Sequence, residues 1–176
     1  LRKQIKARGL EKPLGLGRIW RVVPDNNPRR VIPNLSILTQ LDLVSYIQHP
    51  NGSVRDMAQR LLVESTEPQP EVISVLEKIA ATAELDRDRI KALWTLQGMG
   101  RLSKKLVVSS LKDSHPIVRT HAIRLSEPWI NEKSIFRKVT ALAADPNVLV
   151  KRQVALTVGL NETPEATFFL LSQLGK

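Results

Sequence analysis

The amino-acid sequence predicts an all-α fold, an α-solenoid of stacked helix pairs that follows a short extended N-terminal segment. A turn followed by a helix start recurs along the chain, and each copy carries a basic residue at the same place: Arg55, Arg89, Arg119 and Lys151. The spacings of 34, 30 and 32 residues are typical of helix-pair repeats, which must stack to bury their apolar faces. Apolar residues make up 42% of the chain and aromatic residues only 4%, a balance that favours packed helices over a sheet.

The turn at residues 49–53 shows why a helix pair is expected. Pro50 cannot continue a helix, and Asn51 and Gly52 readily adopt turn conformations. Ser53 is a suitable N-cap for the next helix, whose apolar positions fall on one face: Val54, Ala58, Leu61 and Leu62. An alanine stands three residues after each arginine of the repeats, and we expect this set to be buried: Ala58, Ala92 and Ala122.

Residues 1–36 are predicted to be an extended linker with one short strand. Residues 18–25 alternate arginine with apolar residues and are rich in β-formers, which predicts the strand. A lone strand needs cover for Ile19, Trp20 and Val22. The cover could come from the first helix pair, from a domain outside this chain or from a neighbouring molecule, and we favour the first helix pair.

Residues 37–176 are predicted to form the solenoid, with about four and a half helix pairs. Prolines and glycines separate the helices. The expected pairs are 41–48 with 53–64, 71–84 with 87–97, 103–112 with 117–125, and 132–144 with 148–160, and residues 163–174 form a last helix. Because no partner helix follows the last one, we expect the array to be truncated.

The sequence offers no constellation for catalysis. The absence of cysteine excludes disulfides, thiolate metal sites, a cysteine nucleophile and a c-type haem attachment. The chain has no Gly-x-Ser-x-Gly, Walker or Rossmann pattern and no His, Asp and Glu at metal-ligand spacing. We therefore expect no catalytic, cofactor-binding or metal residues, no cofactor, and no enzymatic activity in this chain. No apolar run approaches the length of a membrane span.

The basic column, defined as Arg55, Arg89, Arg119 and Lys151, allows two interpretations. It could be a cationic stripe that binds phosphates or an acidic partner. It could instead be a structural ladder between repeats, in which each side chain binds helix-end carbonyls or a neighbouring carboxylate, such as Asp56, Asp88 or Asp113. We favour the structural ladder, because the column recurs together with the turn.

A second set of side chains lies five residues after the arginines of the basic column. It contains Arg60, Trp94 and Arg124, and we expect it to mark the surface that binds a partner. Trp94 itself lies in an apolar stretch, which also favours a core position. The formal net charge of +10 would suit an anionic partner or would only confer solubility.

The turn followed by a valine and a basic residue resembles HEAT repeats, including those of the PBS-lyase type. Residues 17–22, 49–62, 92–100 and 118–125 together resemble the HEAT region of the large membrane-bound dehydrogenases of planctomycetes and verrucomicrobia. In that family a sorbosone-dehydrogenase-like β-propeller precedes the HEAT repeats and a c-type cytochrome domain follows them. Residues 17–23 resemble the closing strand of the propeller. The resemblance covers most of residues 17–130.

The resemblance implies a non-catalytic HEAT-like scaffold that links the propeller to the cytochrome domain, in an extracytoplasmic (periplasmic) location. The family's haem motif is absent from this chain, so no redox role is carried onto its residues. The expected partners are another protein or neighbouring domains of the same parent chain. The alternative is a cationic nucleic-acid-binding protein similar to the HEAT-like DNA glycosylases, because 27 Lys and Arg oppose 17 Asp and Glu.

Overall fold

The computed structural model describes residues 2–9, 33–65, 67–161 and 163–173. These residues form α-helices and short 3₁₀-helices and no β-strand, which confirms the all-α prediction for the described part of the chain. The chain divides into two units, residues 1–32 and residues 33–176. The predicted strand at 18–25 and the cover for its apolar side chains lie outside the described residues.

The first unit contains helix α1 (Arg2–Ala7), where the sequence pattern predicts an extended segment. The helix has a physical basis in its sequence, RKQIKA, whose residues mostly have favourable helix propensity. The helix ends at Ala7, and Gly9 follows with a left-handed φ of 63° and an N–H that donates to the carbonyl of Lys6 at 3.1 Å. The expectation of an extended tail is therefore wrong for the first residues of the chain.

The described part of residues 33–176 contains four consecutive helix pairs, a further helix and short 3₁₀-helices. The pairs are α2 (Gln40–Tyr46) with α3 (Gly52–Glu64), α4 (Pro70–Thr82) with α5 (Asp86–Gly98), α6 (Lys104–Ser110) with α7 (Pro116–Leu125), and α8 (Lys133–Ala141) with α9 (Val148–Val158). The further helix is α10 (Pro164–Gln173), and the 3₁₀-helices are η1 (Leu35–Ile37), η2 (Glu127–Trp129) and η3 (Leu142–Ala144). Counting η3 with α8, every predicted helix begins and ends within about two residues of its observed bounds.

Local signals set the helix starts. Thr39 and Asp42 form a reciprocal capping box at the start of α2. The cap of α3 is Asn51, whose side chain accepts the N–H of Ser53 at 3.0 Å. The prediction of Ser53 as the N-cap was therefore wrong by two residues. Prolines occupy the first turn of three helices: Pro70, Pro116 and Pro164.

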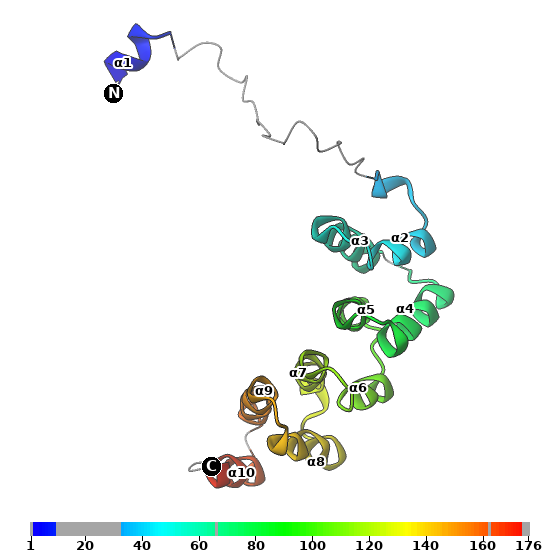
Figure 1. Cartoon of the computed structure of the whole chain (residues 1–176), viewed down its shortest axis with the longest axis vertical. Coiled ribbons are helices and arrows are strands. Elements are labelled where there is room, and N and C mark those ends of the chain that lie inside the picture. Colours follow the sequence, from blue (N-terminus) through cyan, green and yellow to red (C-terminus); the bar gives the residue numbers. More distant parts are fainter. Residues whose placement is uncertain (1, 10–32, 66, 162, 174–176) are drawn as a thin grey trace. The chain divides into compact units, whose positions relative to one another are not determined.

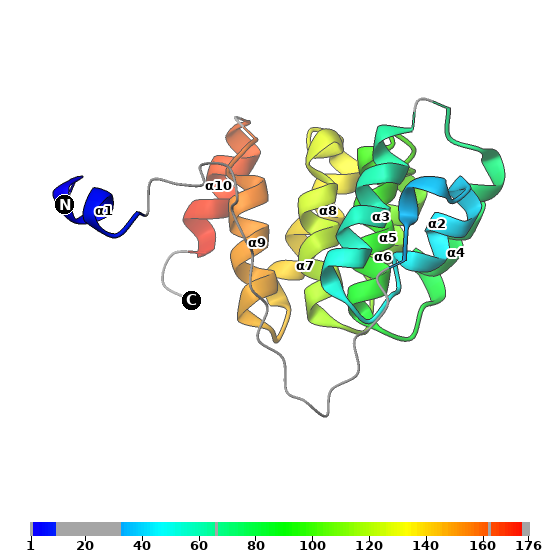
Figure 2. The same ribbon diagram turned by 90° about the horizontal axis from the view of Figure 1, so that it is seen from above.

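The helices of residues 33–176 lie in two layers (Figure 1). The second-helix layer consists of α3, α5, α7 and α9, each in contact with the next, and the first-helix layer consists of α2, α4, α6 and α8. Within each pair the first helix packs against the second, and in Figure 2, seen from above, α3 overlaps α5, the next helix of its layer. Helix α10 contacts α9.

The core runs between the two layers and includes the alanines predicted to be buried. Ala58, Ala92 and Ala122 are fully buried, which confirms that prediction. One apolar cluster joins the first helix pairs and a second joins the last ones, and Trp129 packs against both. Helices α3 and α5 approach closely where α5 ends, because a Cβ on Gly98 would lie 2.7 Å from Cγ2 of Val63.

Candidate functional site

The basic column lies at the junctions between successive helix pairs. Nη1 of Arg89, in α5, donates to the carbonyls of Ala83 and Glu84 at 2.7 and 3.0 Å, just before its own helix. Its Nε and Nη2 donate to the two carboxylate oxygens of Asp113 at 2.9 and 3.0 Å. A planar guanidinium can satisfy both sets of acceptors at once, so Arg89 ties α5 to the turn of the next helix pair.

Arg119 repeats this arrangement one helix pair further on. It donates to the carbonyls of Asp113 and Ser114 at 2.8 and 3.0 Å, and to both carboxylate oxygens of Asp145 at 2.8 and 2.9 Å. Asp113 and Asp145 each stand six residues before the next member of the basic column. At both junctions, therefore, the aspartate that precedes a basic-column residue by six positions binds the arginine of the preceding helix pair.

The two ends of the basic column differ from its centre. Arg55 donates to the carbonyls of His49 and Pro50 at 2.7 and 2.9 Å and has no carboxylate partner among the described residues. The reason is that Ala83 occupies the register position of Asp113 and Asp145 in the next pair. The side chain of Lys151 is exposed and makes no hydrogen bond or ion pair with any described residue, although its charge acts on Asp145.

Two of the three carboxylates named as candidate partners have other contacts. Asp56 accepts from Nζ of Lys91 at 2.6 Å, and Asp88 pairs with Arg87 at 3.2 Å. Lys91 also donates to Gln59 at 2.9 Å, so it links α5 to α3 beside the basic column. Sequence reasoning missed the Lys91 link, for which no sequence signal is evident.

Asp145 is the less exposed of the two junction carboxylates. Its side chain is only 4% exposed, and it also accepts the backbone N–H of Asn147 at 2.9 Å. The hydrogen bonds from Arg119 lower the pKa of Asp145 below its ordinary value, with help from the Asn147 N–H and the charges of Arg119 and Lys151, while burial opposes the shift. The sequence reasoning missed Asp145 as a partner, although its 32-residue distance from Asp113 was a usable signal.

The candidate partner surface contains a three-residue cluster, Trp94, His121 and Arg124. Nε1 of Trp94 donates to Nδ1 of His121 at 3.1 Å, and the two rings meet edge to face. The guanidinium of Arg124 lies over the Trp94 ring, 5.7 Å from its centroid. Burial lowers the pKa of His121, and the charge of Arg124 lowers it further. The cluster bridges α5 and α7, with Arg124 exposed at its outer edge.

The structure separates Arg60 from the other two predicted surface residues. Arg60 lies on α3 and is 65% exposed, and its Nε donates to Glu64 at 2.6 Å within the same helix. Trp94 packs partly against the apolar core, as its apolar neighbours in the sequence indicate. His121 belongs to the cluster but was not predicted, because its 27-residue distance from Trp94 matches no local pattern.

Neither a metal centre nor a membrane-spanning helix is evident in the described part of the chain. Within these residues no three His, Cys, Asp or Glu side chains gather in a way that could hold a metal ion. The helices described here all fall short of the length and hydrophobicity that crossing a bilayer requires. Comparisons of the chain with protein-family models, with curated proteins and with solved structures found no match.

Proposed function

We propose that this chain is a non-catalytic α-solenoid of HEAT-like helix pairs that binds a protein partner along its second-helix layer. The observation that carries the proposal is the repetition of the Arg89–Asp113 contact by Arg119 and Asp145 at successive junctions. A repeated contact of this kind places equivalent positions of successive helices in one line. Helix-pair repeats arranged in this way present long surfaces suited to protein binding.

The Trp94, His121 and Arg124 cluster supports a binding role for this layer. Trp and Arg are the residues most enriched at the energetic centres of protein interfaces. Arg124 is exposed and has no ion-pair partner among the described residues, and it covers a tryptophan ring. An acidic side chain of a partner could pair with Arg124 while an apolar group packs beside Trp94. Arg60, on α3, stands at the same register as Trp94 and Arg124, and the proposed surface includes it.

The resemblance to membrane-bound dehydrogenases adds a narrower proposal about the partner. In this proposal the partners are neighbouring domains of a parent protein, a propeller dehydrogenase domain and a cytochrome domain, outside the cytoplasm. The support is the sequence resemblance of residues 17–130 alone. Sequencing the surrounding gene tests it, because a Cys-x-x-Cys-His segment downstream and a propeller upstream are the expected result.

Affinity capture from an extract of the source organism tests the binding surface. The wild-type chain should retain a protein that a triple variant, R60E, W94F and R124E, fails to retain. The phenylalanine keeps an aromatic ring at position 94, so the fold should survive. A matched control changes two exposed lysines of the first-helix layer, K78E and K105E, and should retain the protein. Identical capture by the triple variant would overturn the assignment of the surface.

A second candidate function, nucleic-acid binding, rests on an uneven distribution of charge. Residues 101–176 contain 12 Lys and Arg against 6 Asp and Glu, whereas residues 33–100 contain 6 against 9. Helix α8 carries three basic residues without an ion-pair partner among the described residues: Lys133, Arg137 and Lys138. Binding of this kind releases counterions and should weaken steeply as salt rises. A gel-shift titration with duplex DNA at low salt tests it, and the absence of any retarded complex would reject it.

A further inference from the structure

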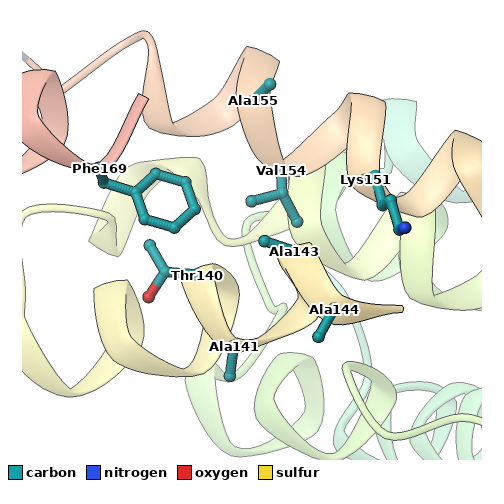
Figure 3. A pocket seen from close by; sticks show the side chains of 8 residues that line it. All are labelled: Thr140, Ala141, Ala143, Ala144, Lys151, Val154, Ala155 and Phe169. Carbon is teal, nitrogen blue, oxygen red and sulfur yellow. The ribbon is translucent and has the colours of Figure 1, made fainter. Parts of the chain in front are cut away.

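One side of α9 borders a groove that includes Lys151, the last member of the basic column. The groove has a volume of about 550 Å³ and lies between α8 with η3, α9 and α10. Figure 3 shows the ring of Phe169 at one end of the groove and Lys151 at the other. Between them the walls are mostly small and apolar, with Ala143, Val154 and Ala155 among them.

Aligning the repeats shows that one position of α9 carries a smaller side chain than the equivalent positions of α5 and α7. Ala155 stands four residues after Lys151, as Leu93 follows Arg89 and Ile123 follows Arg119. Leu93 and Ile123 are fully buried, whereas Ala155 is exposed. The groove therefore has room for a large apolar side chain supplied from outside the described residues.

The charge of Lys151 is a second feature of this groove. Arg89 and Arg119, at the same register, each bind a carboxylate of the following helix pair. Those carboxylates belong to Asp113 and Asp145, which lie three residues before the first residue of α7 and of α9. Lys151 makes no such ion pair with a described residue, although its charge acts on Asp145, so its ammonium group can still pair with a carboxylate at the edge of the apolar groove.

We propose that this groove binds a helix of another protein that is preceded by an aspartate or glutamate and carries a large apolar side chain. The carboxylate pairs with Lys151, and the apolar side chain packs over Ala155. In a second copy of this chain the carboxylates at the equivalent register, Asp113 and Asp145, are already held by Arg89 and Arg119, so that register offers no free carboxylate. This surface is distinct from the Arg60, Trp94 and Arg124 surface and does not depend on it.

Exposed apolar side chains on α9, which forms one wall of the groove, enlarge the surface that such a helix could cover. They include Val148, 72% exposed, Leu149, 37% exposed, and Leu156, 58% exposed. Burying them, together with the groove, removes apolar surface from water and so favours docking. The ion pair with Lys151 then fixes the orientation of the bound helix, because a charge contact beside an apolar contact can form in only one orientation.

A peptide with the sequence of residues 143–160 tests the proposal, because it contains Asp145 three residues before Val148. A lactam bridge on its polar side holds it helical, and fluorescence anisotropy measures its binding to the full-length chain. Replacing the peptide's aspartate by asparagine should weaken binding about tenfold, as expected for the loss of one charge-assisted pair. K151M in the chain should weaken it equally, and the two changes together should cost no more than either alone.

Two further variants control for nonspecific effects. A155L fills the groove and should abolish most of the binding, whereas K138M, an exposed lysine of α8 outside the groove, should leave it unchanged. Equal affinity for the aspartate and asparagine peptides would overturn the proposal, as would the absence of binding at about 1 mM peptide. A dimer of the chain alone that K151M or A155L dissociates, seen by light scattering, would overturn the choice of another protein as occupant.

Discussion

The guanidinium of Arg119 binds both carboxylate oxygens of Asp145, at 2.8 and 2.9 Å, and so joins α7 to the turn before α9. The two side chains are 14% and 4% exposed. The remaining N–H groups of Nη1 bind the carbonyls of Asp113 and Ser114, so the arginine satisfies acceptors on both sides of the junction. Because the pair is largely withdrawn from water, breaking it leaves a charge without its partner.

R119M should lower the free energy of unfolding by about 3–5 kcal/mol, because Asp145 would remain buried and unpaired. Urea unfolding followed by circular dichroism measures the change. Adding D145N to R119M should restore part of the loss, since the buried charge is then removed.

R55M provides the matched control for this prediction. Arg55 occupies the same register but binds only the carbonyls of His49 and Pro50, so R55M should cost clearly less than R119M. Equal losses for the two variants would show that the carboxylate pair adds nothing to the junction.

Acid should weaken the same junction. Because Arg119 lowers the pKa of Asp145 below 3.8, its value in the unfolded chain, the folded state favours the carboxylate. Its contribution to stability is therefore complete above about pH 4 and is lost as the pH falls through the lowered pKa. D145N removes this contribution, so its free energy of unfolding should fall less steeply between about pH 4 and pH 2 than that of the wild type. Parallel curves for the two proteins would contradict the prediction.

The helix bounds were predictable because their signals are local. Pro70, Pro116 and Pro164 mark helix starts in the sequence, and the structure places them in first turns. The cross-junction partners were harder to predict, because they depend on how separate helices pack. Asp145 lies 26 residues after Arg119, and His121 lies 27 residues after Trp94. Regular spacing could have revealed Asp145, whereas the hydrogen bond between Trp94 and His121 occurs once and leaves no repeat to detect.

Overpacking a buried alanine of α5 should destabilise the protein. Ala92 is fully buried within the apolar cluster of the first helix pairs, so A92L must displace neighbouring side chains. The expected loss is roughly 1–3 kcal/mol in the free energy of unfolding. Thermal unfolding measures it, with Q97L at an exposed position of the same helix as a test of the helix's tolerance to leucine. An unchanged midpoint for A92L would contradict the close packing at this position.

The contact between Gly98 and Val63 makes a second packing prediction. A Cβ at position 98 would lie 2.7 Å from Cγ2 of Val63, and a valine has little freedom to rotate away. G98A should therefore lower the free energy of unfolding by about 1 kcal/mol, even though alanine favours a helix. The double variant V63A and G98A should be more stable than the sum of the two single losses predicts. Simple additivity would show that the two residues do not meet.

The hydrogen bond from Trp94 to His121 should break as the pH falls below 6.5. Nδ1 of His121 accepts the indole N–H, so protonation at Nδ1 must break this bond. Burial and the charge of Arg124 lower the pKa of His121 below 6.5, so the neutral ring stabilises the fold above that value and loses this effect as the pH falls through the lowered pKa. The indole proton of Trp94, followed by ¹H–¹⁵N NMR, should shift with a midpoint below 6.5. R124M removes the neighbouring charge and should move the midpoint upward, while H121F should abolish the shift. If R124M left the midpoint unchanged, the charge of Arg124 would have no influence on the pKa of His121, which would contradict the electrostatic coupling of these two side chains.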